Sequence, residues 1–263
     1  MGQTVASEMG EGSVRVFTKA LLKDLQALEK MLDEGLIESG VRRFGCEQEM
    51  FLVNQAWRAA PVAMEVLERL DEEAFTTELA RFNLEMNLEP MTLGGGCFSA
   101  LQVRIEELLE MAREAAGQLG ADVVLAGILP TLGMSDLTLD NITPMPRYHA
   151  LNERLTRMRG GSYRLQLEGH DELQIEHDSV MLEACNSSCQ VHLQVDAEDF
   201  AATYNVAQAM TGPVLASAVN SPILFGKRLW AETRIALFRQ SLDTRSTTVH
   251  LREFSPRVRF GDR

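Results

Sequence analysis

The segment FNLEMNLE, from Phe82 to Glu89, alternates strictly between apolar and oxygen-bearing side chains. Successive side chains of a β-strand point to opposite faces, so this segment predicts a strand with two unlike faces. One face carries only apolar residues, which are Phe82, Leu84, Met86 and Leu88. The other face carries Asn83, Glu85, Asn87 and Glu89. The pattern favours a sheet that has a core on one side and a carboxylate- and amide-rich face on the other.

Two further segments repeat this arrangement. In residues 188–195, SCQVHLQV, apolar positions alternate with a polar set, which is Ser188, Gln190, His192 and Gln194. In a strand expected over residues 42–53, Glu47 and Glu49 share one face, with Gly45, Phe51 and Val53 around them. None of the three polar sets contains Lys or Arg, although these residues are frequent on solvated faces. The three strands therefore share one chemical character.

Two interpretations of these polar faces compete. For any single strand the simpler one is exposure to water, which is usual for one face of an antiparallel sheet. Taken together, the strands offer carboxylates, amides and one imidazole, which are ligands suited to Mg²⁺ or Mn²⁺. Clustered carboxylates must be neutralised by cations or protons. The combination favours a sheet face that binds divalent ions.

The remaining segments place helices around antiparallel strands. Apolar spacing predicts helices over 14–37, 61–70, 99–119, 148–158, 197–219 and 230–242. A short buried strand is predicted over 123–129 and a hairpin over 164–177. Regular βαβ units are missing from this order, so the predicted fold class is α+β, an antiparallel β-sheet covered by helices. Residues 1–40 are expected to form a tail and a helix, and residues 41–263 the main domain.

Composition narrows the classes of partner. The chain has 263 residues and a formal net charge of -13, which disfavours nucleic-acid binding because like charges repel. Its longest apolar run is far too short to span a bilayer, so no membrane partner is expected. The N-terminus lacks a signal peptide, and the four cysteines form no CxxC pair. We therefore expect a cytoplasmic protein.

Several short motifs together resemble one enzyme family. In chain order they are Gly45-Cys46-Glu47-Gln48-Glu49, Glu78, Phe82 to Asn87 with Pro90, Gly127 to Thr131, Ser188 to His192, Asn220-Ser221-Pro222 and Trp230 to Arg234. Each motif alone is weak, but their order and spacing resemble the glutamate–cysteine ligase (carboxylate–amine ligase) superfamily. The resemblance runs from about Arg42 to the end of the chain.

This resemblance implies a glutamine-synthetase-like fold whose concave sheet face binds ATP and divalent ions. It implies an ATP- and Mg²⁺-dependent ligase, with Mn²⁺ as the alternative ion, that activates the side-chain carboxylate of glutamate as an acyl phosphate. An amine such as cysteine would then attack. By resemblance the metal ligands would be Glu47, Glu49, Glu78, Glu85 and His192, and the nucleotide would contact Gln190 and His192. Arg234 would be the catalytic cation, since a guanidinium suits a carboxylate or phosphoryl group.

Some of these assignments have a structural alternative. Glu78 could be a solvated strand end, His192 a hydrogen-bonded structural histidine, and Arg234 the partner of Glu232 in a surface salt bridge. Ligases of this kind also continue past this length with a further Arg and Glu pair. We therefore expect the domain over 41–263 to be truncated at its C-terminus, leaving a sheet edge that favours homo-oligomers.

Two other functional hypotheses stay open at this point. One is a non-catalytic domain of the same fold that binds ATP and metal or regulates a partner. The other is an unrelated α+β scaffold whose polar strand faces contact only water. The identity of the amine is not encoded in these motifs.

Overall fold

The structure of the protein is a computed structural model that describes residues 11–241. Its helices are α1 (Glu11–Asp33), α2 (Ala63–Leu67), α3 (Cys97–Gly117), α4 (Pro146–Arg159), α5 (Phe200–Ser217) and α6 (Thr233–Ser241), with 3-10 helices η1 (Met134–Asp136), η2 (Leu139–Asn141), η3 (Val180–Cys185) and η4 (Ala197–Asp199). The strands are β1 (Arg43–Asn54), β2 (Phe75–Thr77), β3 (Asn83–Thr92), β4 (Ala121–Val124), β5 (Tyr163–Glu168), β6 (Glu172–His177), β7 (Cys189–Leu193), β8 (Ile223–Leu224) and β9 (Lys227–Arg228). The expected N-terminal tail and the expected C-terminal truncation lie outside the described residues.

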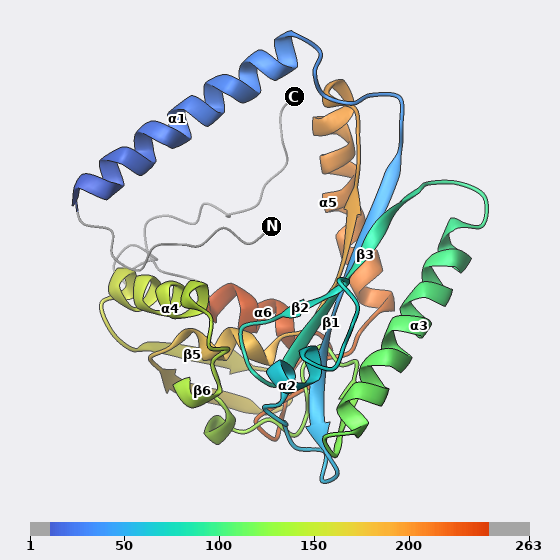
Figure 1. The fold of residues 1–263 in the computed structure, drawn as a ribbon. Helices are drawn as coiled ribbons and strands as arrows, with labels where there is room; N and C mark the ends of the chain where they lie inside the picture. Colours follow the sequence, from blue (N-terminus) through green and yellow to red (C-terminus); the bar gives the residue numbers. More distant parts are fainter. Residues whose placement is uncertain (1–10, 242–263) are drawn as a thin grey trace.

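The central sheet is antiparallel, and β1 is the strand that pairs with β3, β4 and β7. Its order is β2-β3-β1-β4, and β7 pairs with the first half of the same β1 edge that β4 occupies further on. Figure 1 shows α3 on one side of this sheet, with α4, α6 and the β5–β6 hairpin on the other. The predicted α+β class, an antiparallel sheet covered by helices, is confirmed.

Opposite faces of the sheet pack into separate cores. On one face Met50, Leu84 and Met86 are fully buried in a cluster that includes the apolar side of α3. On the other face Phe51 lies in a second cluster, together with residues of β5, β6, η3 and α6. On β1 the second core includes Val53 and Phe51. The next residue on the same face, toward the start of the strand, is Glu49. The alternation read in the sequence thus places carboxylates beside a core without burying them in it.

The strand predicted over 123–129 is too long. The ladder with β1 ends at Val124, and Leu125 is exposed. Gly127 then uses its backbone for two other segments, donating to the carbonyl of Asn220 and accepting from the amide of Ser187, each at 3.0 Å. An apolar run cannot show that its backbone groups bond elsewhere, so this error arises from tertiary contacts.

One tight turn depends on a glycine. In the β5–β6 hairpin, a Cβ on Gly169 would lie 2.6–2.7 Å from backbone atoms of Leu229. Only a residue without a side chain permits this approach. The hairpin predicted over 164–177 contains this glycine, and the close contact explains why the position needs one.

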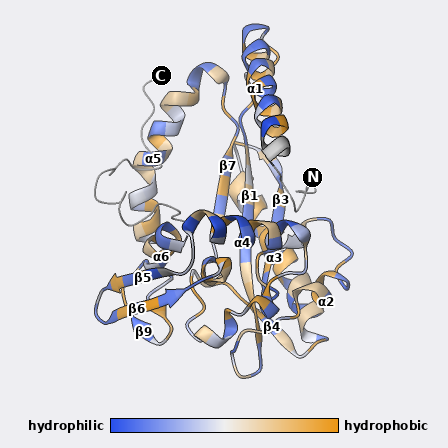
Figure 2. Cartoon of the chain, turned by 90° about the vertical axis from the view of Figure 1, so that its left-hand side faces the viewer, coloured by the Kyte–Doolittle hydropathy of each residue, from blue (hydrophilic) through white to orange (hydrophobic). Residues whose placement is uncertain are grey.

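Several elements present apolar side chains to solvent. Every residue of β7 is exposed, and none of the residues of α5 is buried. In α1, residues 15–33 are all exposed, and Figure 2 shows hydrophobic and hydrophilic positions interleaved along that helix. Within residues 11–241, each helix is too short or too polar to cross a bilayer.

Candidate metal centre

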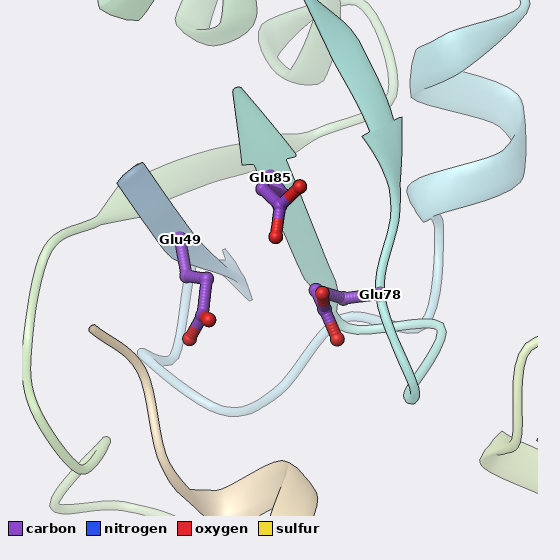
Figure 3. A group of neighbouring side chains, drawn as sticks. All are labelled: Glu49, Glu78 and Glu85. Atoms are coloured by element: carbon purple, nitrogen blue, oxygen red, sulfur yellow. The ribbon is translucent and has the colours of Figure 1, made fainter. Parts of the chain in front are cut away.

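Three glutamates from separate positions in the chain converge on one point of the sheet. Glu49 on β1 is the cross-strand partner of Glu85 on β3, and Glu78 lies in the loop that joins β2 to β3. One carboxylate oxygen from each lies within 4.8 Å of the others. Figure 3 shows the three carboxylates directed toward a shared space. We call Glu49, Glu78 and Glu85 the carboxylate trio.

Glu49 is held in place by the segment that leads into β7. Its two carboxylate oxygens accept hydrogen bonds from the backbone amide of Ser188 at 2.8 Å and from its hydroxyl at 3.0 Å. Burial raises the pKa of Glu49, and the negative charges of Glu85 and Glu47 add to this effect, although the bonds from Ser188 oppose it. The carboxylate is therefore oriented but not fully neutralised.

Glu78 shows the strongest electrostatic perturbation in the trio. Burial, followed by the neighbouring charges of Glu49 and Glu85, raises its pKa to about 8. The backbone amide of Leu79 donates to its Oε2 at 2.9 Å, which works in the opposite direction. Glu85 accepts a bond from the side-chain amide of Asn87 at 2.7 Å. Without a cation, the trio holds a proton on Glu78 near neutral pH.

Glu47 and His192 lie next to the trio but form a pair of their own. Glu47 stands between Asn87 on β3 and Gln190 on β7 in the sheet register. Its Oε1 lies 3.1 Å from Nε2 of His192. The imidazole of His192 is about half exposed, at 55%, so it remains accessible to a ligand. All of these positions share the trio's face of the sheet.

In the structure Arg234 contacts Glu232. Its Nε and Nη2 donate to the Glu232 carboxylate at 2.6 and 3.0 Å, and its Nη1 donates to the carbonyl of Ser187 at 3.1 Å. Glu232 also accepts from the hydroxyl of Ser221. The alternative of a pair with Glu232 matches this geometry, although the pair is mostly buried and not a surface one. The catalytic role of Arg234 stays a prediction.

Two features near the trio were missed in the sequence. Glu183 lies on η3 among buried apolar residues, and burial together with the charge of Glu49 raises its pKa to about 7. Arg147 donates to Oγ1 of Thr77, the residue before Glu78, at 2.9 Å. It also donates to the hydroxyl of Tyr148 at 2.6 Å. A lone carboxylate inside the apolar run from Val180 to Cys185 was the available signal for Glu183.

The donor set fits a small divalent cation. The trio supplies three carboxylates, and oxygen ligands of this kind suit Mg²⁺ and Mn²⁺. The raised pKa values of Glu49 and Glu78 report repulsion and burial that a cation would relieve. The arrangement can therefore hold a metal ion, and through it an anionic substrate, on an acidic protein.

Comparison with known proteins places the chain in a family. The profile of Glutamate-cysteine ligase family 2 (GCS2) matches residues 43–257. The chain belongs to Glutamate-cysteine ligase family 2. A relative in Frankia alni, named "Putative glutamate--cysteine ligase 2-3", is 31% identical over 110 residues, which are 41% of this chain and 12% of the relative. The chain thus spans a small part of that relative's length.

Within this member of Glutamate-cysteine ligase family 2, the family region begins at the start of β1. It contains the trio, the Glu47–His192 pair and the Arg234–Glu232 pair, while α1 lies outside it. The family assignment confirms the resemblance that the sequence motifs indicated. It supports a ligase at the level of the family.

Metal binding to this member of Glutamate-cysteine ligase family 2 is expected to depend on pH, because Glu78 carries a proton that Mg²⁺ must displace. With a pKa of about 8, Glu78 is mostly protonated at pH 6.5 and half deprotonated at pH 8. Mg²⁺ affinity should therefore rise roughly tenfold between pH 6.5 and 8. Calorimetry in two buffers of different ionisation enthalpy would measure both the affinity and the released proton.

The matched control is Glu78→Gln, which removes the titrating group and keeps the shape. This variant should bind Mg²⁺ more weakly, with a flatter pH dependence over the same interval. Equal affinity of the unaltered chain at both pH values would contradict a proton shared by the trio.

Proposed function

We propose that this chain carries the catalytic face of an ATP- and Mg²⁺-dependent carboxylate–amine ligase. In the proposed reaction, the side-chain carboxylate of glutamate is activated as an acyl phosphate, and an amine such as cysteine then attacks it. The observation that carries the proposal is the carboxylate trio on the open face of the sheet, in a chain that belongs to a ligase family.

The proposed reaction has two transfers. A carboxylate oxygen of glutamate attacks the γ-phosphorus of ATP, and ADP leaves. The amine nitrogen then attacks the acyl carbon, phosphate leaves, the nitrogen loses a proton and an amide bond remains. Bound divalent ions would offset the charge of the phosphoryl group, which is the main requirement of this chemistry. The protein's own task is to hold and orient the ligands.

In this proposal the trio, Glu49, Glu78 and Glu85, holds the metal, and Ser188 fixes the direction of Glu49 through its two hydrogen bonds. Glu47 and His192, 3.1 Å apart on the same face, form the adjoining ligand pair. Gln190, the cross-strand partner of Glu47, would contact the nucleotide together with His192.

A hollow beside this pair supports a nucleotide site. Its volume is about 350 Å³, and its lining includes Gly45, Glu47, Asn87 and His192. A space of this size is in the range of small-ligand sites. Its position next to the trio is suited to a ligand whose phosphates reach the metal.

The test is a coupled assay of the chain with glutamate, ATP and Mg²⁺, in which cysteine and a panel of other amines are supplied one at a time. We expect ADP release that requires glutamate and an amine, and a γ-amide product in the mass spectrum. If calorimetry detects Mg²⁺–ATP binding but no amine gives ADP, the chain is a non-catalytic nucleotide-binding domain. Absence of both binding and turnover would contradict the metal site itself.

A further inference from the structure

Two free thiols lie next to each other on the face of the sheet opposite the carboxylate trio. Cys46 is on β1 and Cys189 is on β7, and their sulfur atoms are 3.5 Å apart. The two residues are 143 positions apart in the chain, so it is the pairing of β7 with β1 that brings them together. The ligase proposal gives neither thiol a role.

The two thiols differ in their exposure to solvent. Cys189 is exposed, whereas Cys46 is 2% exposed and belongs to the core that packs against α3. An oxidant in solution therefore reaches Cys189 first, because accessible cysteines react and buried ones are inert. A sulfenic acid formed on Cys189 would have the thiol of Cys46 only 3.5 Å away, in the place of a resolving cysteine.

The covalent step takes a peroxide as its oxidant. The thiolate of Cys189 attacks one oxygen of hydrogen peroxide, the O–O bond breaks, and the hydroxide that leaves is protonated to water, so that Cys189 becomes a sulfenic acid. The sulfur of Cys46 then attacks the sulfur of Cys189. The S–O bond breaks, and the departing hydroxide takes the thiol proton of Cys46 and forms a second water. Two thiols are oxidised to one disulfide, and one peroxide is reduced to two waters.

The register of the two strands means that this bond requires a backbone shift. Cys189 lies opposite Gln48, so Cys46 is its diagonal neighbour, two residues nearer the start of β1. Diagonal neighbours have Cα atoms about 7–8 Å apart, whereas disulfide-bonded cysteines usually have theirs within about 6.8 Å. The sulfur atoms must also approach from 3.5 Å to about 2 Å. Rotation of the side chains alone does not close both gaps.

The strand that is free to shift is β7. Among the strands of residues 11–241 it pairs only with β1, and every one of its side chains is exposed. Closing the bond would draw Cys189 from Gln48 toward Cys46, which is the direction away from Glu49. Ser188 would move with it. The two hydrogen bonds that Ser188 donates to the Glu49 carboxylate, at 2.8 and 3.0 Å, would then lengthen or break.

From these features we infer that Cys46 and Cys189 are a peroxide-sensitive thiol pair whose disulfide weakens metal binding at the carboxylate trio. The inference rests on the proposed metal site and adds a reversible control of it. Reduction by a dithiol would return β7 to its register with β1 and Ser188 to Glu49.

Mass spectrometry on the whole chain, treated with hydrogen peroxide in dilute solution, tests the covalent step. The intact chain should lose two hydrogen atoms and yield a peptide pair joined through Cys46 and Cys189, which dithiothreitol separates. Cys189→Ser, a change at an exposed position, should form no such bond. Cys46→Ala should leave a sulfenic acid on Cys189 that dimedone traps. Cys97→Ser is the matched control, since it removes a partly exposed cysteine outside the pair and should leave the bond intact.

Calorimetric Mg²⁺ titrations of the reduced and the oxidised chain test the coupling. The oxidised chain should bind Mg²⁺ about tenfold more weakly, which is the loss typical when a group that orients a metal ligand is removed. Dithiothreitol should restore the affinity. Peroxide-treated Cys189→Ser should keep the affinity of the reduced chain, and this variant also controls for oxidation of methionines.

Three results would overturn the inference. The first is a treated chain in which no bond joins Cys46 to Cys189, or in which Cys189 joins two copies of the chain instead. The second is an internal disulfide that leaves the Mg²⁺ affinity unchanged, in which case the proposed metal site stands without this control. The third is a reduced chain that binds no Mg²⁺, which would contradict the metal site and, with it, the control, even where the disulfide forms.

Discussion

Replacing Glu85 by glutamine is expected to lower the turnover number of the proposed ligase about a thousandfold, which corresponds to roughly 4 kcal/mol of transition-state stabilisation. Glu85 is the trio member on β3, directly opposite Glu49, and its loss leaves two carboxylates where three converge. The metal would bind more weakly and would offset less charge on the transferred phosphoryl group. Initial rates at saturating ATP, measured across a Mg²⁺ titration, would show a lower maximum and a higher half-saturating Mg²⁺ concentration.

The control for this result is Glu73→Gln. Glu73 is an exposed carboxylate in the loop before β2, so its replacement changes the net charge equally and leaves the trio intact. Its activity should stay close to that of the unaltered chain. Without Mg²⁺, Glu85→Gln should not lower the melting temperature, since it removes a negative charge that repels Glu49 and Glu78. Retention of a third or more of the activity by Glu85→Gln would count against the trio as the metal site.

Replacing Arg234 by glutamine is expected to lower the free energy of unfolding by about 2–4 kcal/mol. The guanidinium is 18% exposed and the carboxylate of Glu232 only 9%, so the substitution leaves a mostly buried, unpaired charge. It also removes the donor to the carbonyl of Ser187, the residue before the one that orients Glu49. Urea denaturation would measure the loss of stability.

Two further variants test whether the loss of stability comes from the Arg234–Glu232 pair or from any change in helix α6. Arg239→Gln changes an exposed arginine of the same helix and should shift the free energy of unfolding by no more than about 0.5 kcal/mol. Glu232→Gln added to Arg234→Gln should recover part of the stability, because the unpaired charge disappears. The interpretation fails if Arg234→Gln costs no more than Arg239→Gln.

The local part of the fold could be predicted because the pattern that encodes it is local. Alternation in β3 showed that Leu84, Met86 and Leu88 share a face, and their burial in one core confirms it. Phe82, predicted on the same face, lies in the other core instead, because the strand begins only at Asn83. Which carboxylates meet is decided by strand register and by the path of the loop that carries Glu78, and neither is visible in a short segment. Glu47 and Glu49 are two residues apart on one face, yet Glu49 joins the trio and Glu47 lies against His192.

The sequence also could not show which hydrogen-bond partners a given residue has in the fold. The motif around Arg234 contains Glu232, but its spacing alone could not show that the carboxylate binds the guanidinium through two of its nitrogens. The prediction of a strand through residue 129 is wrong for the same reason, because the backbone of Gly127 forms hydrogen bonds with Asn220 and Ser187. Long-range partners of this kind follow from the assembled fold.

The alternation of β1 and β3 also limits how this domain can change its length. Because neighbouring residues of each strand belong to opposite sides, adding or removing one residue inside β1 would exchange the two sides beyond that point. Glu49 would then be forced into the core against α3, and Met50 would take its place on the ligand face. A substitution on one face of these strands changes that face alone. A single-residue insertion or deletion in them disrupts both the packing of the core and the ligand site. Length variation among relatives should therefore concentrate in loops such as residues 55–58, which lie at the far end of β1 from the hollow.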